Sequence, residues 1–173
     1  MLDPEQLIFI DETWVTTNMA RRCGWAPRGK RLVAGAPYGH WKTTTFVAGL
    51  RCDGIVAPCA IDGPMNGEAF LAYVEQILAP ILRPNQFVIM DNLSSHKVCG
   101  VEQAITARQA MPLYLPPYSP DLNPIENAFA KLKALLRAAA ERTVSSLWDR
   151  IGSLLHLFTP HECRNYFRHA GYD

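Results

Sequence analysis

Acidic residues stand at three places where a sequence pattern ends or changes. Asp11 follows the apolar run LIFI, Asp91 follows the run FVIM, and Glu126 comes directly after the turn YSPDLNPI. Three carboxylates that converge within several ångströms repel one another by about 4 kcal/mol per pair at an effective dielectric constant of about 20. Hard oxygen ligands of this kind favour Mg²⁺ or Mn²⁺. If the fold brings the three acids together, their residue types therefore predict a divalent-metal site.

Glu126 also has a purely structural interpretation. Asn123 is a good N-cap residue, and Pro124 fits the first position of a helix, which places Glu126 third in that helix. A glutamate there can fold back to the N-cap in a capping box, and the helix dipole favours it. Taken alone, this stretch favours the capping role, whereas Asp121 is predicted to be a turn former. Partner acids elsewhere in the chain decide between the two roles of Glu126.

The apolar runs predict the strands that would carry the first two acids. Strands are expected at residues 7–10, 43–50, 55–61, 87–90 and 112–115, the second and third of them forming an antiparallel hairpin. The continuous runs at 7–10 and 87–90 are typical of central strands buried on both faces. Ligands of open α/β sheets bind at the carboxyl ends of such strands. Asp11 and Asp91 are therefore expected at one edge of the sheet.

Helical patterns fill most of the remaining chain. Helices are predicted at residues 66–82, 94–110, 124–140, 143–158 and 161–169, with Pro80 ending or kinking the first of them. Residues 24–39 contain four glycines and two prolines, which predicts a twisted hairpin or a mobile loop. The order of elements describes an α/β domain with a mixed sheet, in which antiparallel hairpin strands come first and parallel strands follow, flanked by helices.

Length and composition restrict the class of protein. A chain of 173 residues is expected to form a single domain with its own core, over residues 1–173. Its apolar runs are too short to span a membrane. The five cysteines are odd in number and contain no C-x-x-C pair, so neither a disulfide framework nor a zinc knuckle is predicted.

The net charge of +1 argues against a chain that holds nucleic acid by its overall charge. The basic residues are nevertheless clustered. Arg21, Arg22, Arg28, Lys30 and Arg31 lie within eleven positions that contain no acid, and Lys131, Lys133, Arg137 and Arg142 follow Glu126. A solvated face is the usual explanation of such clusters unless a polyanion is otherwise implied.

Three segments together resemble a known family. The stretches FIDET, VIMDNLSSHK and LPPYSPDLNPIENAFAKLK are similar to the catalytic domain of mariner-superfamily insertion-sequence transposases, which are DDE endonucleases. The resemblance extends over residues 7–136. The 34 residues from 92 to 125, between the second and third acids, match the spacing of this branch, whereas the 79 residues from 12 to 90 are less informative. YSPDLNPIE is the most specific of the motifs.

The resemblance implies an RNase H-like fold and assigns roles to particular residues. Asp11, Asp91 and Glu126 become catalytic residues and ligands of Mg²⁺ or Mn²⁺, with two ions expected. Asp11 and Asp91 are expected to share one ion, and Glu126 and Asp11 to hold others. Positioning roles are expected for Asn92, His96 and Asn123. Contacts with DNA phosphates are expected for Arg28, Lys30, Arg31, Lys97, Lys133 and Arg137.

The implied activity is that of a Mg²⁺-dependent DNA endonuclease and polynucleotidyl transferase. Such a transposase hydrolyses phosphodiesters at the ends of its element and transfers the 3′-hydroxyl into target DNA, in the cytoplasm of a bacterial cell and in association with the nucleoid. Its expected partner is DNA, on which the chain is expected to act as a homodimer.

Relatives carry a helix-turn-helix region before the catalytic domain, whereas here the first predicted strand begins at Leu7. A helix-turn-helix region is therefore expected to be absent from this chain. The chain could be the second product of a split reading frame, a truncated copy or a trimmed piece. Recognition of element ends is expected from elsewhere, including a separately encoded DNA-binding half.

Two other functions remain open from the sequence. A host nuclease or resolvase on the same fold would cut DNA without strand transfer, and joining of the cut ends to a second DNA separates the two activities. A catalytically idle domain could serve for oligomerisation or DNA binding. The presence of all three acids argues against the idle domain.

Overall fold

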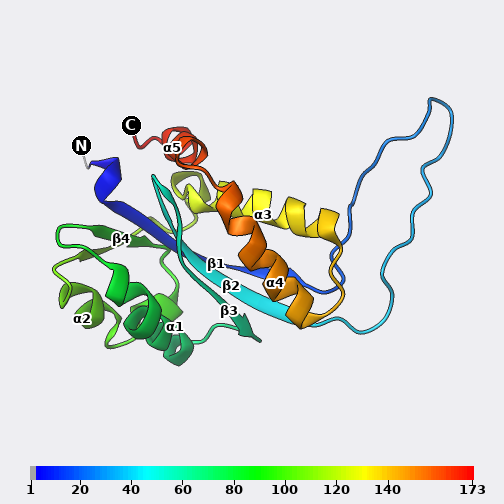
Figure 1. Cartoon of the computed structure of the whole chain (residues 1–173). Coiled ribbons are helices and arrows are strands. Elements are labelled where there is room, and N and C mark those ends of the chain that lie inside the picture. Colours follow the sequence, from blue (N-terminus) through cyan, green and yellow to red (C-terminus); the bar gives the residue numbers. More distant parts are fainter. Residues whose placement is uncertain (1–2) are drawn as a thin grey trace.

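A five-stranded mixed sheet forms the centre of the molecule (Figure 1). The structure is a computed structural model that describes residues 3–173. Its strands are β1 (Leu7–Thr16), β2 (Thr43–Arg51), β3 (Gly54–Asp62), β4 (Phe87–Met90) and β5 (Met111–Tyr114). They lie in the order β3-β2-β1-β4-β5, in which β2 is antiparallel to β1 and β3, and β4 pairs in parallel with both β1 and β5. The predicted hairpin followed by parallel strands is confirmed.

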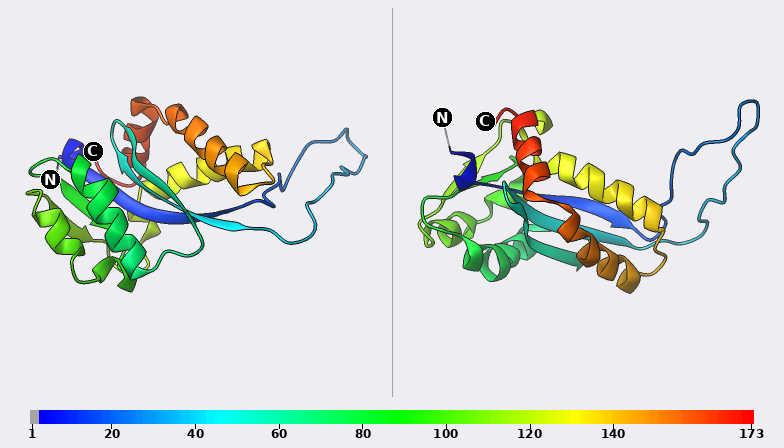
Figure 2. Two further views of the ribbon diagram at one scale, coloured as in Figure 1. Left: turned by 60° about the horizontal axis from the view of Figure 1, so that its bottom comes forward. Right: turned by 45° about the horizontal axis from the view of Figure 1, so that its top comes forward.

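Helices cover both faces of this sheet. One face carries α1 (Gly67–Tyr73) and α2 (Val101–Thr106), and the other carries α3 (Ile125–Ala139), α4 (Val144–Leu154) and α5 (Pro160–His169) (Figures 1 and 2). Because side chains alternate along a strand, β1 serves both cores. Leu7 and Phe9 pack with α3, α4 and α5, whereas Ile8 and Ile10 pack with α1 and α2. Within residues 3–173, no helix has the length and apolar character that a bilayer span needs.

Strand β1 is longer than predicted. It continues past Ile10 to Thr16, so Asp11 lies inside the strand and not at its end. The prediction was wrong because an apolar run marks only the part of β1 that is buried on both faces. That part pairs with β4, and the remainder keeps its ladder with β2 alone. The acid thus lies where the parallel ladder stops, although the strand continues.

The predicted helix over residues 94–110 is also wrong. A short 3₁₀ helix spans Ser94–Lys97, and α2 begins only after Gly100. Gly100 has φ of 105°, a left-handed conformation that breaks a helix and that a residue without Cβ adopts readily. Its N–H donates to Gln103 Oε1 at 2.8 Å, which starts the second helix.

The first predicted helix is confirmed in extent but not in regularity. Asn66 caps α1, its side chain accepting from the N–H of Ala69 at 2.8 Å. The helix then widens into a π turn over Val74–Leu78 and ends in a 3₁₀ turn over Ala79–Ile81. Pro80 explains this ending, because proline has no N–H to donate into a preceding turn.

Residues 17–42 form a long irregular loop between β1 and β2. The loop extends far from the sheet (Figures 1 and 2) and, within the described chain, contains no helix or strand. The hairpin alternative for residues 24–39 was therefore wrong. Two hydrogen bonds close the base of the loop, from Thr17 N to Lys42 O and from Lys42 N to Thr17 Oγ1, both at 3.1 Å.

The end of α3 provides a test of local strain. Its C-cap residue, Ala140, has φ of 56°, which is the left-handed conformation that glycine accommodates best. We expect Ala140→Gly to raise the free energy of unfolding by about 0.5–1 kcal/mol, because the left-handed conformation costs alanine more than glycine. Urea denaturation followed by circular dichroism measures the change.

The matched control is Ala134→Gly, in the exposed interior of the same helix. There the substitution is expected to lower the free energy of unfolding by about 1 kcal/mol, because glycine is a poor helix former. Equal losses in both variants would contradict the strain at Ala140.

Candidate active site

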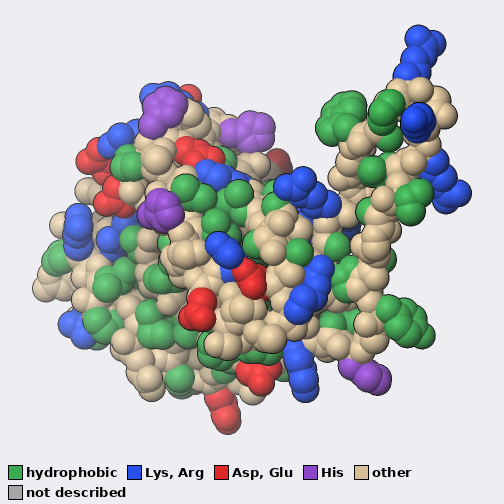
Figure 3. Space-filling model, turned by 45° about the vertical axis from the view of Figure 1, so that its right-hand side comes forward, with side chains coloured by type: hydrophobic (Ala, Val, Ile, Leu, Met, Phe, Trp, Pro, Cys, Tyr) green, Lys and Arg blue, Asp and Glu red, His purple; other side chains and the backbone are tan. Residues whose placement is uncertain are grey.

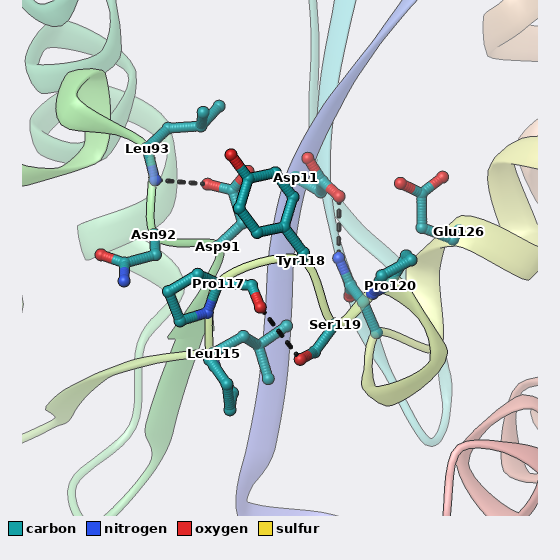
Figure 4. Close-up of a pocket in the computed structure, with 12 residues that line it drawn as sticks. Asp11, Asp91, Asn92, Leu93, Leu115, Pro117, Tyr118, Ser119, Pro120 and Glu126 are labelled. Carbon is teal, nitrogen blue, oxygen red and sulfur yellow. Dashed lines mark hydrogen bonds between the residues drawn. The ribbon is translucent and has the colours of Figure 1, made fainter.

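The register of β1 and β4 places the first two acids side by side. Ile10 pairs with Met90 in the last rung of the parallel ladder, and Asp11 and Asp91 follow directly. Both line a pocket of about 390 Å³ (Figure 4). The expectation that these two acids share one edge of the parallel sheet is confirmed in its geometry.

Glu126 reaches the same pocket from α3, across from Asp91 (Figure 4). The wall between them is the turn that precedes α3, over residues 115–123. The pocket is lined by Asp11, Asp91, Asn92, Leu93, Leu115, Pro116, Pro117, Tyr118, Ser119, Pro120, Asn123 and Glu126. Asp121 is exposed in a 3₁₀ turn and is absent from this lining, as expected of a turn former. One pocket therefore brings together all three acids of the predicted triad.

Asp11 is the buried member of the three. Its side chain is 7% exposed, its Oδ1 accepts from Glu12 N at 2.7 Å, and its Oδ2 accepts from Asn123 Nδ2 at 2.8 Å. Burial raises the pKa of Asp11 to about 7, and the negative charges of Glu126, Asp91 and Glu12 add to that rise against the opposing hydrogen bond from Glu12 N. The pocket thus holds more negative charge than its own groups neutralise.

Asn123 does not cap α3 with its side chain, which corrects the sequence prediction. The N-cap residue is Pro124, the helix begins at Ile125, and Glu126 makes no capping hydrogen bond. The side chain of Asn123 turns instead to Asp11, and its Nδ2 donates to the buried Oδ2 of that residue. Its Oδ1 is buried and has no hydrogen-bond partner within the described residues. The capping interpretation of Glu126 was therefore wrong.

The Asp91 carboxylate contacts the buried side chain of His96. The His96 side chain is fully buried, with Nδ1 2.6 Å from Asp91 Oδ1 and Nε2 2.9 Å from Glu12 Oε2. Burial alone would lower the pKa of His96, but the two carboxylates raise it to about 9. Leu93 N also donates to Asp91 Oδ1, at 3.2 Å. The imidazolium cation thus connects two strands underneath the pocket.

The donor set suits a hard divalent cation. Within residues 3–173, no three His, Cys, Asp or Glu side chains are gathered closely enough to form a finished metal cage. The three carboxylates nevertheless face one pocket, where burial first, and then the negative charges of Glu126, Asp91 and Glu12, raise the pKa of Asp11. The unpaired Oδ1 of Asn123 is a further oxygen acceptor there. Oxygen donors with excess negative charge are what Mg²⁺ and Mn²⁺ bind.

The predicted DNA-binding residues fall into three places. Lys133 and Arg137 border a second hollow of about 480 Å³, next to Arg21 and Arg22. Arg28, Lys30 and Arg31 lie on the projecting loop, which shows Lys and Arg side chains on its outer part (Figure 3). Lys97 is near neither group, its Nζ lying 5.3 Å from the centre of the Tyr114 ring. None of these six residues lines the pocket of the acids.

Sequence reasoning missed several residues near the site. Glu12 received no role, although its position after Asp11 in a strand implies that it faces the opposite layer. Arg21 and Arg22 were counted among the clustered cations but not assigned to DNA. Tyr118 lines the pocket fully exposed and with φ of 57°, and no local signal predicts this conformation for a tyrosine.

The sheet order and the carboxylates beside the end of the β1–β4 ladder define an RNase H-like α/β domain, and solved structures agree. The chain is similar to a pre-cleavage Mos1 transpososome, with a TM-score of 0.78 and 16% identity over 96% of this chain and 52% of that chain. A Mos1 strand transfer complex has a TM-score of 0.74 and 18% identity, over 96% of this chain and 50% of that chain. The catalytic domain of Mos1 mariner transposase has a TM-score of 0.66 and 15% identity, over 96% of this chain and 76% of that chain. The chain spans about half the length of the first two.

Residues 6–147 match the family of DDE superfamily endonucleases. The chain belongs to this family. A search of curated proteins found no match.

Proposed function

We propose that the chain is the catalytic domain of a mariner-type DDE transposase, which hydrolyses DNA phosphodiesters at element ends and transfers the 3′-hydroxyl into target DNA. The observation that carries the proposal is the convergence of Asp11, Asp91 and Glu126 on one pocket from β1, β4 and α3. Similarity to a transpososome and a strand transfer complex of Mos1 supports it.

Asp11, Asp91 and Glu126 are proposed to hold Mg²⁺ or Mn²⁺, as two ions. Mos1 complexes with Mg and with Mn are among the similar structures. Divalent ions bound by carboxylates activate a water or 3′-hydroxyl nucleophile and stabilise the leaving oxygen of a displacement at phosphorus. Asn123 would fix Asp11 through its 2.8 Å hydrogen bond, and His96 would fix Asp91. Asn92, which lines the same pocket, is also proposed to be a positioning residue.

DNA is the proposed substrate and partner. The basic hollow formed by Arg21, Arg22, Lys133 and Arg137 is bordered by α3, the helix that carries Glu126, so a strand lying along α3 could reach the pocket. The projecting loop adds Arg28, Lys30 and Arg31 together with exposed apolar side chains, including Trp25 and Tyr38. Such a surface could meet DNA and a second copy of the chain, and we propose a homodimer on DNA. Lys97 is retained as a weaker candidate for a phosphate contact.

End recognition is proposed to come from a separately encoded DNA-binding half. A transposase acts where its DNA lies, so we propose that this chain works in the bacterial cytoplasm, at the nucleoid.

A cleavage and joining assay tests the proposal. Labelled DNA carrying element ends is incubated with the chain, Mg²⁺ and an unlabelled target, with and without EDTA. We expect Mg²⁺-dependent cutting followed by covalent joining of the label to the target. Cutting without joining would instead indicate a nuclease or resolvase. An absence of both, with Mn²⁺ failing to bind the chain, would indicate an idle domain.

Metal affinity is expected to depend on pH through Asp11. Its pKa of about 7 means that the carboxyl is mostly protonated at pH 6, and an entering cation must displace that proton. The dissociation constant for Mn²⁺ should therefore rise about tenfold per pH unit below pH 7 and level off above it. Electron paramagnetic resonance of free Mn²⁺ between pH 5.5 and 8.5 measures this. A constant affinity across that range would contradict the prediction.

The basic hollow is expected to hold DNA backbone phosphates. Lys133→Ala combined with Arg137→Ala should weaken DNA binding equally for different sequences, and should reduce the slope of log K against log[salt] by about 2, one unit for each lost phosphate contact. Fluorescence anisotropy at several salt concentrations measures both quantities. Arg108→Ala, an exposed cation beyond α2 on the opposite face of the sheet, is the matched control and should change neither.

A further inference from the structure

We propose that Glu12 is a positioning residue that acts through His96 to hold the Asp91 carboxylate in its metal-binding orientation, an inference that rests on the proposed function. Glu12 lies outside the pocket lining and has no expected contact with substrate. Its importance would come from a chain of contacts that runs from β1, through the buried imidazole, to the end of β4.

The direction of Glu12 follows from the alternation of β1. Asp11 faces the layer of α3, where Asn123 and Glu126 meet it. Glu12, the next residue, faces the layer of α1 and α2, as Ile8 and Ile10 do. A glutamate on that side needs a polar partner in a mostly apolar layer. His96 Nε2 is that partner, at 2.9 Å from Glu12 Oε2.

His96 makes contacts through its ring face, its carbonyl oxygen and both of its ring nitrogens. Its ring packs on Phe70 of α1 with centroids 4.2 Å apart, and its carbonyl oxygen accepts from Tyr114 Oη at 3.3 Å. The ring is fully buried, so it has no water to replace a lost partner. Its two nitrogens are therefore committed to two carboxylates, one on each neighbouring strand.

The consequence for Asp91 concerns which of its oxygens is used. Oδ1 accepts from Leu93 N at 3.2 Å and contacts His96 Nδ1 at 2.6 Å. The direction of the His96 contact departs from that of a hydrogen bond, so the contact is an ion pair. With Oδ1 held in this way, Oδ2 is left to face a ligand in the pocket. A carboxylate free to rotate would bind a metal less tightly, because it would lose rotational freedom on binding.

Glu12 makes this arrangement possible. The two ring nitrogens contact the two carboxylates at once, Nε2 at 2.9 Å from Glu12 and Nδ1 at 2.6 Å from Asp91, so the contact with Glu12 helps to fix the ring that meets Asp91. With an amide at position 12, the ring loses one of these two contacts with a carboxylate, and its orientation against Asp91 is less firmly fixed. An interaction of this kind, one step removed from a metal ligand, changes metal affinity about 10–100-fold when it is lost.

The experiment compares Mn²⁺ binding to the metal-free chain by electron paramagnetic resonance. Glu12→Gln keeps the size of the side chain and removes its charge, and we expect its dissociation constant for Mn²⁺ to rise at least about tenfold. Glu75→Gln, an exposed acid on the same side of the sheet, removes the same charge and should bind like the wild type. Affinity of Glu12→Gln within twofold of the Glu75→Gln control would overturn the proposal.

A double-mutant cycle with His96→Gln separates positioning from general destabilisation. If Glu12 acts only through His96, the Glu12→Gln/His96→Gln chain should bind Mn²⁺ as weakly as His96→Gln alone. The double variant replaces both partners of the contact together and leaves neither of them facing an unmatched group, so it is expected to fold even if Glu12→Gln alone does not. Wild-type affinity in the folded double variant would overturn the proposal.

Different results would refute the proposed function and the proposed role of Glu12. A wild-type chain that binds no Mn²⁺ refutes both the proposed function and the role of Glu12. A wild-type chain that binds Mn²⁺ and cleaves DNA, alongside a Glu12→Gln variant that binds Mn²⁺ equally well, refutes only the role of Glu12.

Discussion

Glu126→Gln is expected to abolish metal-dependent DNA cleavage and to leave the fold unchanged. The substitution keeps the shape of the side chain but replaces a carboxylate with a neutral amide, which is a poor ligand for a hard divalent cation. Removing one member of a catalytic set that acts as a unit lowers the rate by about 10³-fold or more. The measurement is single-turnover cleavage of labelled DNA in Mg²⁺.

The fold should tolerate this change because Glu126 is exposed and makes no capping hydrogen bond. The change removes the interaction of Glu126 with the α3 dipole, worth about 0.3–1 kcal/mol. It also removes the repulsion between Glu126 and Asp11, which offsets part of that loss. Asp121→Asn, which removes a charge from the turn before α3 but lies outside the pocket, is the matched control and should cleave normally. Cleavage by Glu126→Gln at the wild-type rate would refute its place in the triad.

Asp11→Asn is expected to stabilise the metal-free chain while it abolishes cleavage. Burial raises the pKa of Asp11 from its ordinary value of 3.8 to about 7, so the folded chain keeps a proton that the unfolded chain releases between those values. The stability of the wild type therefore falls as pH rises through that window and stays low above pH 7. The charged form costs on the order of 4 kcal/mol there, at about 1.4 kcal/mol per pH unit.

Asparagine removes this pH-dependent cost but accepts fewer hydrogen bonds than a carboxylate, which costs about 1 kcal/mol. We therefore expect Asp11→Asn to be more stable than the wild type by on the order of 2–3 kcal/mol at pH 8, with no gain at pH 4. Urea denaturation in EDTA at the two pH values measures the difference. Mg²⁺ should reduce it at pH 8, since only the wild type gains from binding.

His96 also changes stability with pH, because its pKa is raised to about 9 and its contribution is lost as pH rises through that value. Both proteins share this contribution, so it cancels in the difference. A stability difference that is the same at pH 4 and pH 8 would contradict the assignment of the raised pKa to Asp11.

The sequence predicted those parts of the fold that depend on long apolar patterns. The hairpin, the parallel strands and the long helix after Pro124 all follow from periodicity, and the structure confirms them. The pattern of an acid after a buried strand also predicted that Asp11 and Asp91 would lie at one edge of the sheet. The convergence of Glu126 with them was expected from the family resemblance, and one pocket is lined by all three.

The failures came where a distant partner outcompeted a local preference. Asn123 has the properties of an N-cap, but Asp11, 112 positions away in the chain, takes its side chain. Strand β1 extends beyond its apolar run because β2 supplies partners for residues that no periodic pattern marks. Gly100 could have been recognised as a helix stop, but its position within an otherwise helical run concealed the break.

Glu12 and His96 show a different limit. They are 84 positions apart, and nothing local to either residue names the other as its partner. The parallel register of β1 and β4 brings Glu12, the residue after Asp11, to His96, which contacts Asp91. Only this register shows the contact. Contacts of this kind can be identified only when the fold is known.

The two hydrogen bonds between Thr17 and Lys42 close the projecting loop at its base, so the sheet ends in the same way whatever the loop contains. Doubling the length of a flexible loop costs only about 0.6 kcal/mol of closure entropy. Insertions, deletions or an exchanged sequence between these two residues should therefore leave the carboxylate pocket intact. The loop can thus change its partner independently of the chemistry, and it is the natural place to graft a different binding segment.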